Sequence, residues 1–289
     1  MNNKSWNSEL SEYIKQSEPS KSYKAKTWET AIGLQDVDRL KISNYLIETA
    51  KNHIEGKIDI DEAKDRINNY YKEQHNRSAK NNTEEADKVA VRITEILSEK
   101  TFSFSPTELQ NIHKRLFTGI YQKAGVYRDY NITKNEWGLN GDTVTYSSHE
   151  IIESTLKYDF REEKEFSYKN MNLDDSIKHL CRFISNIWQV HPFCEGNTRT
   201  TAVFLIKYLR NFGFNVNDEI FKNNSWYFRN SLVRANYNNI SKNIFEDISY
   251  LEKFFYNLLT NSNYELKNRN LHVDYSQNVN KKDSKDNSY

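Results

Sequence analysis

Apolar residues recur three and four positions apart along most of the chain, which is the spacing of amphipathic helices. One helix is predicted from Asp36 to Glu55, with Gly56 as its stop. A second begins at Asp59, which stands three residues before Glu62 as in a capping box. This helix pair is too small to be a stable fold alone, so we expect it to pack on the rest of the chain.

A longer helical region follows the polar stretch 74–85, which we interpret as a boundary. Ser105 and Pro106 form a strong helix start, because serine caps helices and proline fits their first position. An amphipathic helix is predicted over 177–190, and the segment 202–209 is apolar almost all round, so its helix should be central and buried. Further helices are predicted over 225–236 and 244–259.

One segment has a different pattern. Asn140 and Gly141 lie between short apolar flanks in 137–146, the sequence signal of a tight β-hairpin. Together with the scarcity of glycine (8) and proline (3), the patterns predict an all-α fold with a single β-hairpin. We divide the chain into a partly ordered N-terminus (1–30), a helical module (31–80), a main domain (87–260) and a polar tail (261–289).

The charge balance excludes some classes of function. The 41 basic and 40 acidic residues nearly cancel, so nothing favours direct binding to nucleic acid or to an anionic membrane. No run approaches the roughly 20 apolar residues that span a bilayer, and the first residues lack the apolar stretch of a secretory signal. We interpret the two cysteines as reduced thiols. Together with the lack of an apolar span and of a secretory signal, they predict a cytoplasmic protein.

The run from His191 to Arg199 carries the candidate chemistry. Gly196 stands directly before a predicted helix, whose free N–H groups and dipole attract an anion. Arg199 in the first helical turn adds a guanidinium suited to phosphate oxygens. Glu195 can hold Mg²⁺, and His191 can take a proton from an attacking hydroxyl near neutral pH. These residue types together favour phosphate-transfer chemistry.

The sequence HPFCEGNTR at 191–199 resembles the signature of the Fic family, usually H-x-F-x-(D/E)-G-N-G-R-x-x-R. The likeness extends over roughly 87–260 and includes Gly125-x-Tyr127-Arg128. The resemblance implies a protein adenylyltransferase, which moves AMP from Mg-ATP to a Ser, Thr or Tyr hydroxyl of a target protein.

The resemblance also implies a role for each residue of the motif. His191 would be the general base and Glu195 the Mg²⁺ ligand. The ATP phosphates would be bound by Gly196, Asn197, Thr198 and Arg199. The hairpin resembles the flap over a Fic active site, and it would dock the target segment through Leu139, Asn140, Gly141, Asp142 and Thr143.

Two positions depart from the family pattern. Thr198 replaces a glycine and adds a hydroxyl beside the phosphates, and Ala202 replaces the second arginine of the motif. Either the loss of this arginine weakens the binding of ATP, or another cation such as Lys207, Arg229 or Arg234 substitutes for it. These departures leave open a different donor nucleotide, the removal of AMP, or a catalytically weak member that binds another Fic protein as an antitoxin does.

Glu55 and Gly56 resemble the end of the inhibitory motif (S/T)-x-x-x-E-(G/N) of Fic antitoxins and self-inhibited Fic proteins, with Lys51 in place of the Ser or Thr. The module at 31–80 is therefore antitoxin-like. Glu55 would pair with Arg199 and displace the outer phosphate, either within one chain or in a homo- or hetero-oligomer with another Fic protein. A zinc site or a Cys194 nucleophile is the weaker reading of the histidines and cysteines, because no zinc loop and no orienting third group accompany them.

Overall fold

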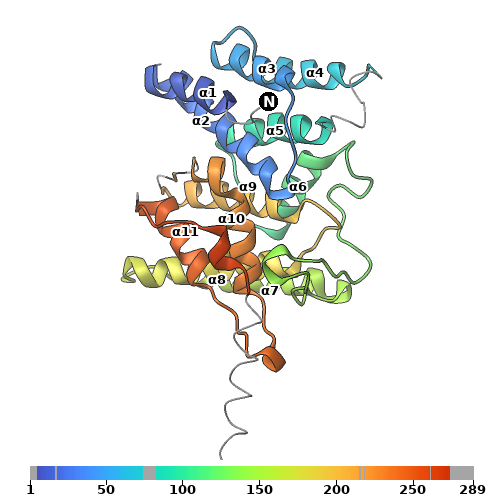
Figure 1. Cartoon of the computed structure of the whole chain (residues 1–289), viewed down its shortest axis with the longest axis vertical. Coiled ribbons are helices and arrows are strands. Elements are labelled where there is room, and N and C mark those ends of the chain that lie inside the picture. The colour runs from blue at the N-terminus through green and yellow to red at the C-terminus, as the bar shows by residue number, and fades with distance from the viewer. Residues whose placement is uncertain are drawn as a thin grey trace, which may run out of the picture. The chain divides into compact units, whose positions relative to one another are not determined.

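The computed structural model describes residues 5–16, 18–73, 83–214, 216–217, 219–260 and 262–273, which form an all-α structure (Figure 1). The α-helices are α1 (Ser5–Gln16), α2 (Pro19–Gly33), α3 (Asn44–Ile54), α4 (Ile60–Tyr70), α5 (Glu84–Ser98), α6 (Pro106–Phe117), α7 (Ile152–Glu165), α8 (Leu173–Val190), α9 (Asn197–Asn211), α10 (Ile220–Ala235) and α11 (Ser249–Thr260). Short 3-10 helices are η1 (Leu34–Asp38), η4 (Trp137–Leu139), η5 (His149–Ile151), η6 (Ile240–Lys242) and η7 (Asn268–Leu271). No helix in these ranges is both long and apolar enough to cross a membrane.

The contacts divide the chain into two compact units. Unit 1 contains the described residues of 1–128, 193–226 and 258–261, and unit 2 contains those of 129–192, 227–257 and 262–289. In unit 1, α2 packs on α1, α3 and α5, and α9 packs on α5, α6 and η1. In unit 2, α7 packs on α8. The candidate motif is therefore shared between the units, with His191 in unit 2 and residues 193–199 in unit 1.

The N-terminal segment is more structured than the sequence suggested. Residues 1–30 were expected to be partly ordered, yet 5–16 and 19–30 lie in α1 and α2. Trp28 is fully buried and its indole N–H donates to His53 Nδ1 over 3.0 Å. Gly33 ends α2 so close to the start of α10 that an added Cβ would lie 2.4 Å from Lys222 Cα. The polar average of this segment conceals a buried face.

The predicted helix from Asp36 to Glu55 is interrupted in the structure. η1 ends at Asp38, the next residue Arg39 adopts a left-handed conformation (φ 56°), and α3 begins only after Ser43. Ser43 caps α3 by accepting from the Leu46 N–H, and its own backbone N–H donates to the buried Asp87 of α5 over 3.0 Å. A cap that is also tied to α5 decides where α3 starts, and periodicity alone does not reveal it.

Several start signals are confirmed. Asp59 caps α4 by accepting from the Glu62 N–H over 2.8 Å. Ser105 caps α6 in the same way over 3.1 Å, with Pro106 in the first turn. The central helix is also confirmed, because every residue of α9 from 197 to 209 is buried.

The predicted β-hairpin at 137–146 is wrong, since none of these residues is in a strand. The Asn-Gly turn itself exists, with positive φ at both Asn140 (54°) and Gly141 (87°). The first flank coils into η4 instead of extending, and the Gly138 carbonyl accepts from Val273 rather than from the second flank. Glu136 closes the loop through its backbone, donating to Asp142 O and accepting from Gly141 N, both over 3.0 Å.

The predicted polar tail is partly structured. Residues 262–273 include η7, and Leu271 is fully buried. Residues 274–289 of the tail, and 74–82 of the predicted boundary, lie outside the described residues.

Candidate active site

The loop before α9 forms a cradle that only glycine fits. Gly196 is the N-cap of α9 and has φ 75°, a left-handed conformation that side chains other than glycine disfavour. An added Cβ would also lie 2.4 Å from the Phe117 ring. No side chain caps α9 through the N-cap residue. The first N–H groups of this helix therefore have the arrangement that binds anions at helix termini.

Asn197 shapes the same loop. Its side-chain oxygen accepts from the Phe193 N–H over 2.9 Å, and its amide donates back to the Phe193 carbonyl over 2.7 Å. The Asn197 side chain thus closes residues 193–197 into a rigid ring. Any phosphate contact by Asn197 would come from its backbone N–H, so its assignment to the phosphate site stays a prediction in that form.

His113 of α6 supports the loop 193–197, although it was not among the candidate residues predicted from the sequence. Its ring stacks on Phe193 with centroids 3.7 Å apart, and its Nε2 lies 3.0 Å from the Glu195 carbonyl oxygen. The Gly125 N–H donates to His113 Nδ1 over 2.8 Å. Because Nδ1 accepts and a carbonyl can only accept, His113 is neutral with its proton on Nε2. Its position on the apolar face of α6 was the only signal in the sequence.

Burial and the nearby Arg199 together lower the pKa of His113 to about 4, against the raising effect of its contact with the Glu195 carbonyl. Since the unfolded chain binds this proton at higher pH than the folded chain, the free energy of unfolding should fall as the pH drops from about 6.5 to 4. Titration of the imidazole by NMR should show His113 still neutral at pH 5. A His113 pKa near 6.5 would contradict this account.

Arg199 is almost completely enclosed, with only 1% of its surface exposed. Its Nε lies 2.8 Å from Asp38 of η1, and its Nη2 lies 2.6 Å from Glu85 of α5. Gln35 and Tyr121 add contacts of 3.2 and 3.0 Å to the same guanidinium. These partners keep Arg199 charged, and the carboxylates of Asp38 and Glu85 raise its pKa against the opposing effect of burial.

Glu55 has other partners in this structure. Its carboxylate accepts a hydrogen bond from Tyr13 of α1 and pairs with Lys57. These contacts lower the pKa of Glu55. The carboxylates paired with Arg199 are those of Asp38 and Glu85, so the inhibitory role of Glu55 stays a prediction without a contact to support it.

Glu195 is exposed, and its backbone carbonyl contacts His113 Nε2 over 3.0 Å. An exposed carboxylate at the edge of an anion cradle fits Mg²⁺, which is commonly held by one or two carboxylates together with substrate phosphates and water. Thr198 is buried in the first turn of α9.

Two of the cations considered as substitutes for Ala202 are engaged elsewhere. Lys207 donates to the carbonyls of Ile96 and Glu99 at the end of α5. Arg229 of unit 2 pairs with Glu136 over 2.6 Å.

His191 is the C-cap residue of α8 and belongs to unit 2. It has φ 48°, is 4% exposed, and its Nδ1 lies 3.2 Å from the Trp188 carbonyl oxygen. A carbonyl can only accept, so this contact places the proton on Nδ1 and leaves the lone pair on Nε2. The neutral tautomer thus presents Nε2 as a base.

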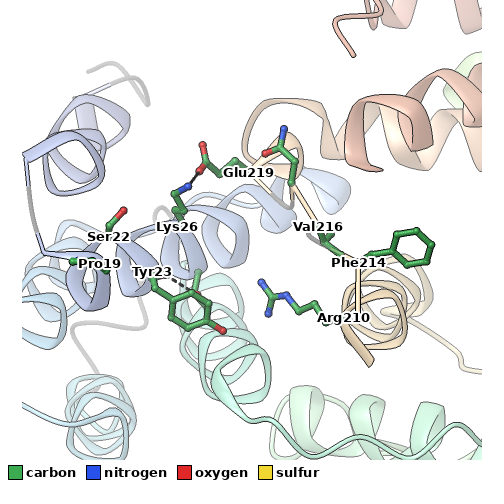
Figure 2. Close-up of a pocket in the computed structure, with 10 residues that line it drawn as sticks. Pro19, Ser22, Tyr23, Lys26, Arg210, Phe214, Val216 and Glu219 are labelled. Atoms are coloured by element: carbon green, nitrogen blue, oxygen red, sulfur yellow. Dashed lines mark hydrogen bonds and ion pairs between the residues drawn. The ribbon is translucent and has the colours of Figure 1, made fainter. Parts of the chain in front are cut away.

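A separate pocket of about 460 Å³ lies in unit 1 and contains none of the predicted site residues. Figure 2 shows it between α2 and the segment after α9, with Lys26 and Glu219 joined over 2.8 Å. Arg210 lies over the Tyr23 ring and donates to the Leu97 carbonyl. The pocket is thus distinct from the cradle at Gly196.

A glycine-capped helix terminus with an arginine in its first turn is typical of proteins that bind phosphate groups. Residues 103–209 match the model of the Fic/DOC family, and the chain therefore carries a domain of that family. One curated relative is Protein adenylyltransferase VbhT of Bartonella schoenbuchensis, 24% identical over 113 residues. The match covers 39% of this chain and only 22% of that relative.

Proposed function

We propose that the chain is a protein adenylyltransferase that moves AMP from Mg-ATP to a hydroxyl of a target protein. The observation that carries the proposal is the cradle at Gly196, where φ 75° and the Phe117 ring together exclude any larger residue. The Fic/DOC match and the name of the VbhT relative support adenylyl transfer as the reaction class.

In the proposed reaction His191 Nε2 accepts the proton of the target hydroxyl. The oxygen of that hydroxyl forms a bond to the α-phosphorus of ATP, and the bond from this phosphorus to the bridging oxygen breaks. Pyrophosphate leaves and AMP remains on the target. The first N–H groups of α9 would stabilise negative charge on the phosphates, and Arg199 would bind the outer phosphates once its guanidinium is available.

Glu195 would hold Mg²⁺, which neutralises phosphate charge when bound. The exposed Asn140 and Gly141 of the loop 136–142 would contact the target together with the half-buried Asp142 and Thr143, whereas Leu139 is fully buried and would only hold the loop in place. This docking role is proposed for a turn and not for a strand pair. Asp142 is anchored, because the Tyr237 hydroxyl donates to its carboxylate over 2.6 Å.

The test uses ATP labelled at either the α- or the γ-phosphate, with Mg²⁺ and a cell lysate as the source of targets. Label from the α-phosphate should reach protein in the wild type and should not do so in Glu195→Ala. Transfer of only the γ label would indicate phosphorylation. Absence of both labels, with ATP binding measured separately, would favour another donor or a binding partner of another Fic protein.

We further propose that Asp38 and Glu85 restrain the enzyme by occupying the guanidinium that the outer phosphates need. In Asp38→Asn and Glu85→Gln the attraction to Arg199 is weakened, so Mg-ATP should bind about 5- to 50-fold more tightly, within the usual range of such couplings. The apo protein should melt at a lower temperature, because Arg199 remains buried with less charge compensation. Calorimetric titration and thermal melts with and without Mg-ATP measure both effects.

Asp61→Asn is the matched control, since Asp61 is an exposed residue of the same unit that pairs with Lys64. It should leave the affinity for ATP unchanged. Glu55→Gln tests the earlier assignment in the same assay. Tighter binding in Glu55→Gln alone would return the inhibitory role to Glu55 and refute the role of Asp38 and Glu85.

A further inference from the structure

His191 is packed between aromatic rings of unit 2. The Tyr146 ring lies 4.4 Å from the imidazole, centroid to centroid, at an interplanar angle of 45°. The Trp188 ring stands at 5.3 Å and 89° to it, and the Trp188 carbonyl is the partner of Nδ1. Rotation of the imidazole about its Cβ–Cγ bond would bring it against these two rings, so the adjacent rings restrict its orientation.

Tyr146 is itself held in place by a buried ion pair. Its hydroxyl donates to Glu136 Oε1 over 3.0 Å, and Glu136 Oε2 lies 2.6 Å from Arg229 Nη1 of α10. The Glu136 side chain is completely buried. Burial and the Glu136 carboxylate both raise the pKa of Tyr146, so its hydroxyl keeps its proton and remains a donor.

Burial of the Glu136–Arg229 pair costs free energy of folding, so stability alone does not explain it. A buried carboxylate loses its hydration, and an apolar replacement of a buried ion pair is often as stable or more stable. The pair does, however, fix the position of the Tyr146 hydroxyl, which a purely apolar contact would not. Glu136 also closes the loop 136–142 through its backbone contacts with Gly141 and Asp142. One residue therefore connects the loop to the ring that packs on His191.

We propose that Tyr146 is a positioning residue for His191, held by the Glu136–Arg229 pair, and that it fixes the imidazole orientation in which Nε2 acts as the base. This inference rests on the proposed function for its kinetic consequence, but the orientation of the ring is measurable without any turnover. General-base catalysis depends on the alignment of the base with the proton it removes, and small misplacements are costly.

The variants are Tyr146→Leu, which removes the ring, and Tyr146→Phe, which keeps the ring and removes only the bond to Glu136. We expect kcat to fall about 30- to 100-fold in the first and about 3- to 10-fold in the second, with the Kd of ATP within about twofold of wild type. Tyr158→Leu is the control, because Tyr158 is an exposed tyrosine of the same unit.

The second measurement is NMR of the His191 ring nitrogens, assigned by the loss of their signals in His191→Ala. The wild type should show a single tautomer with the proton on Nδ1, and Tyr146→Leu should show averaging of the two tautomers. A folded Tyr146→Leu with unchanged His191 signals would overturn the proposal even if the wild type transferred no AMP. A failure of the proposed function with altered His191 signals would leave the positioning role supported. An equal fall of kcat in Tyr158→Leu would also overturn it.

Discussion

Replacement of His191 by alanine is expected to lower kcat for adenylyl transfer by about 100- to 10,000-fold, the usual contribution of a positioned general base. The Nδ1 contact with the Trp188 carbonyl leaves Nε2 as the only ring nitrogen able to accept the target proton. Because His191 contributes a base and no charge to the bound phosphates, the Kd of Mg-ATP should change by less than about threefold. Single-turnover transfer of the α-phosphate label measures the rate, and calorimetric titration measures the affinity.

His272→Ala is the matched control, since His272 is an exposed histidine of unit 2. Its rate should stay within about twofold of wild type. A His191→Ala protein that is folded, binds ATP and still transfers AMP at the wild-type rate would refute the assignment of the base.

Replacement of Gly196 by alanine should have the largest effect on the phosphate site. A left-handed backbone costs a residue with a Cβ about 1–2 kcal/mol, and overpacking against a rigid ring adds about 1–3 kcal/mol. The free energy of unfolding should therefore fall by roughly 2–5 kcal/mol. Urea denaturation measures it, and binding of Mg-ATP should be lost in the protein that remains folded, because the new Cβ moves the loop away from Phe117.

The chain offers a matched control at the other end of the same helix. Gly213 has φ 84°, but nothing lies within 4 Å of the position of an added Cβ. Gly213→Ala should therefore show only the backbone cost of about 1–2 kcal/mol and should bind Mg-ATP normally. Equal destabilisation of the two variants would show that the Phe117 ring yields and that steric exclusion does not define the cradle.

The sequence was sufficient to predict the elements whose signals are local. Asp59 and Ser105 cap their helices through the residue three positions ahead, and the capping bonds are made as expected. The buried helix α9 follows from its apolar composition. The motif at 191–199 is also contiguous, so its family could be identified from the residues themselves.

The remaining features depend on partners that are distant in sequence. Arg199 lies 164 residues from Gln35 and 114 from Glu85, and no local pattern couples them. In the sequence His113 is one residue of the apolar face of a helix, and only the structure shows that Phe193 stacks on it. The failed hairpin has the same cause. Glu136 is buried, where it pairs with Arg229 and accepts a hydrogen bond from Tyr146. The neighbouring flank, which the apolar pattern predicted to be extended, is therefore coiled.

The close approach of Gly33 to Lys222 determines how Arg199 could be uncovered. Since a Cβ at Gly33 would lie 2.4 Å from the Lys222 Cα, the backbones of α2 and α10 are in close contact, and a movement of α2 that withdraws Asp38 would break this contact. η1 directly follows α2, spans only Leu34–Asp38, and is capped by the left-handed Arg39. A single 3-10 turn melts at little cost, whereas moving α2 would break its whole packed face. We therefore expect that access of a phosphate to Arg199 requires local unfolding of η1, which should appear as faster amide hydrogen exchange in η1 than in α2.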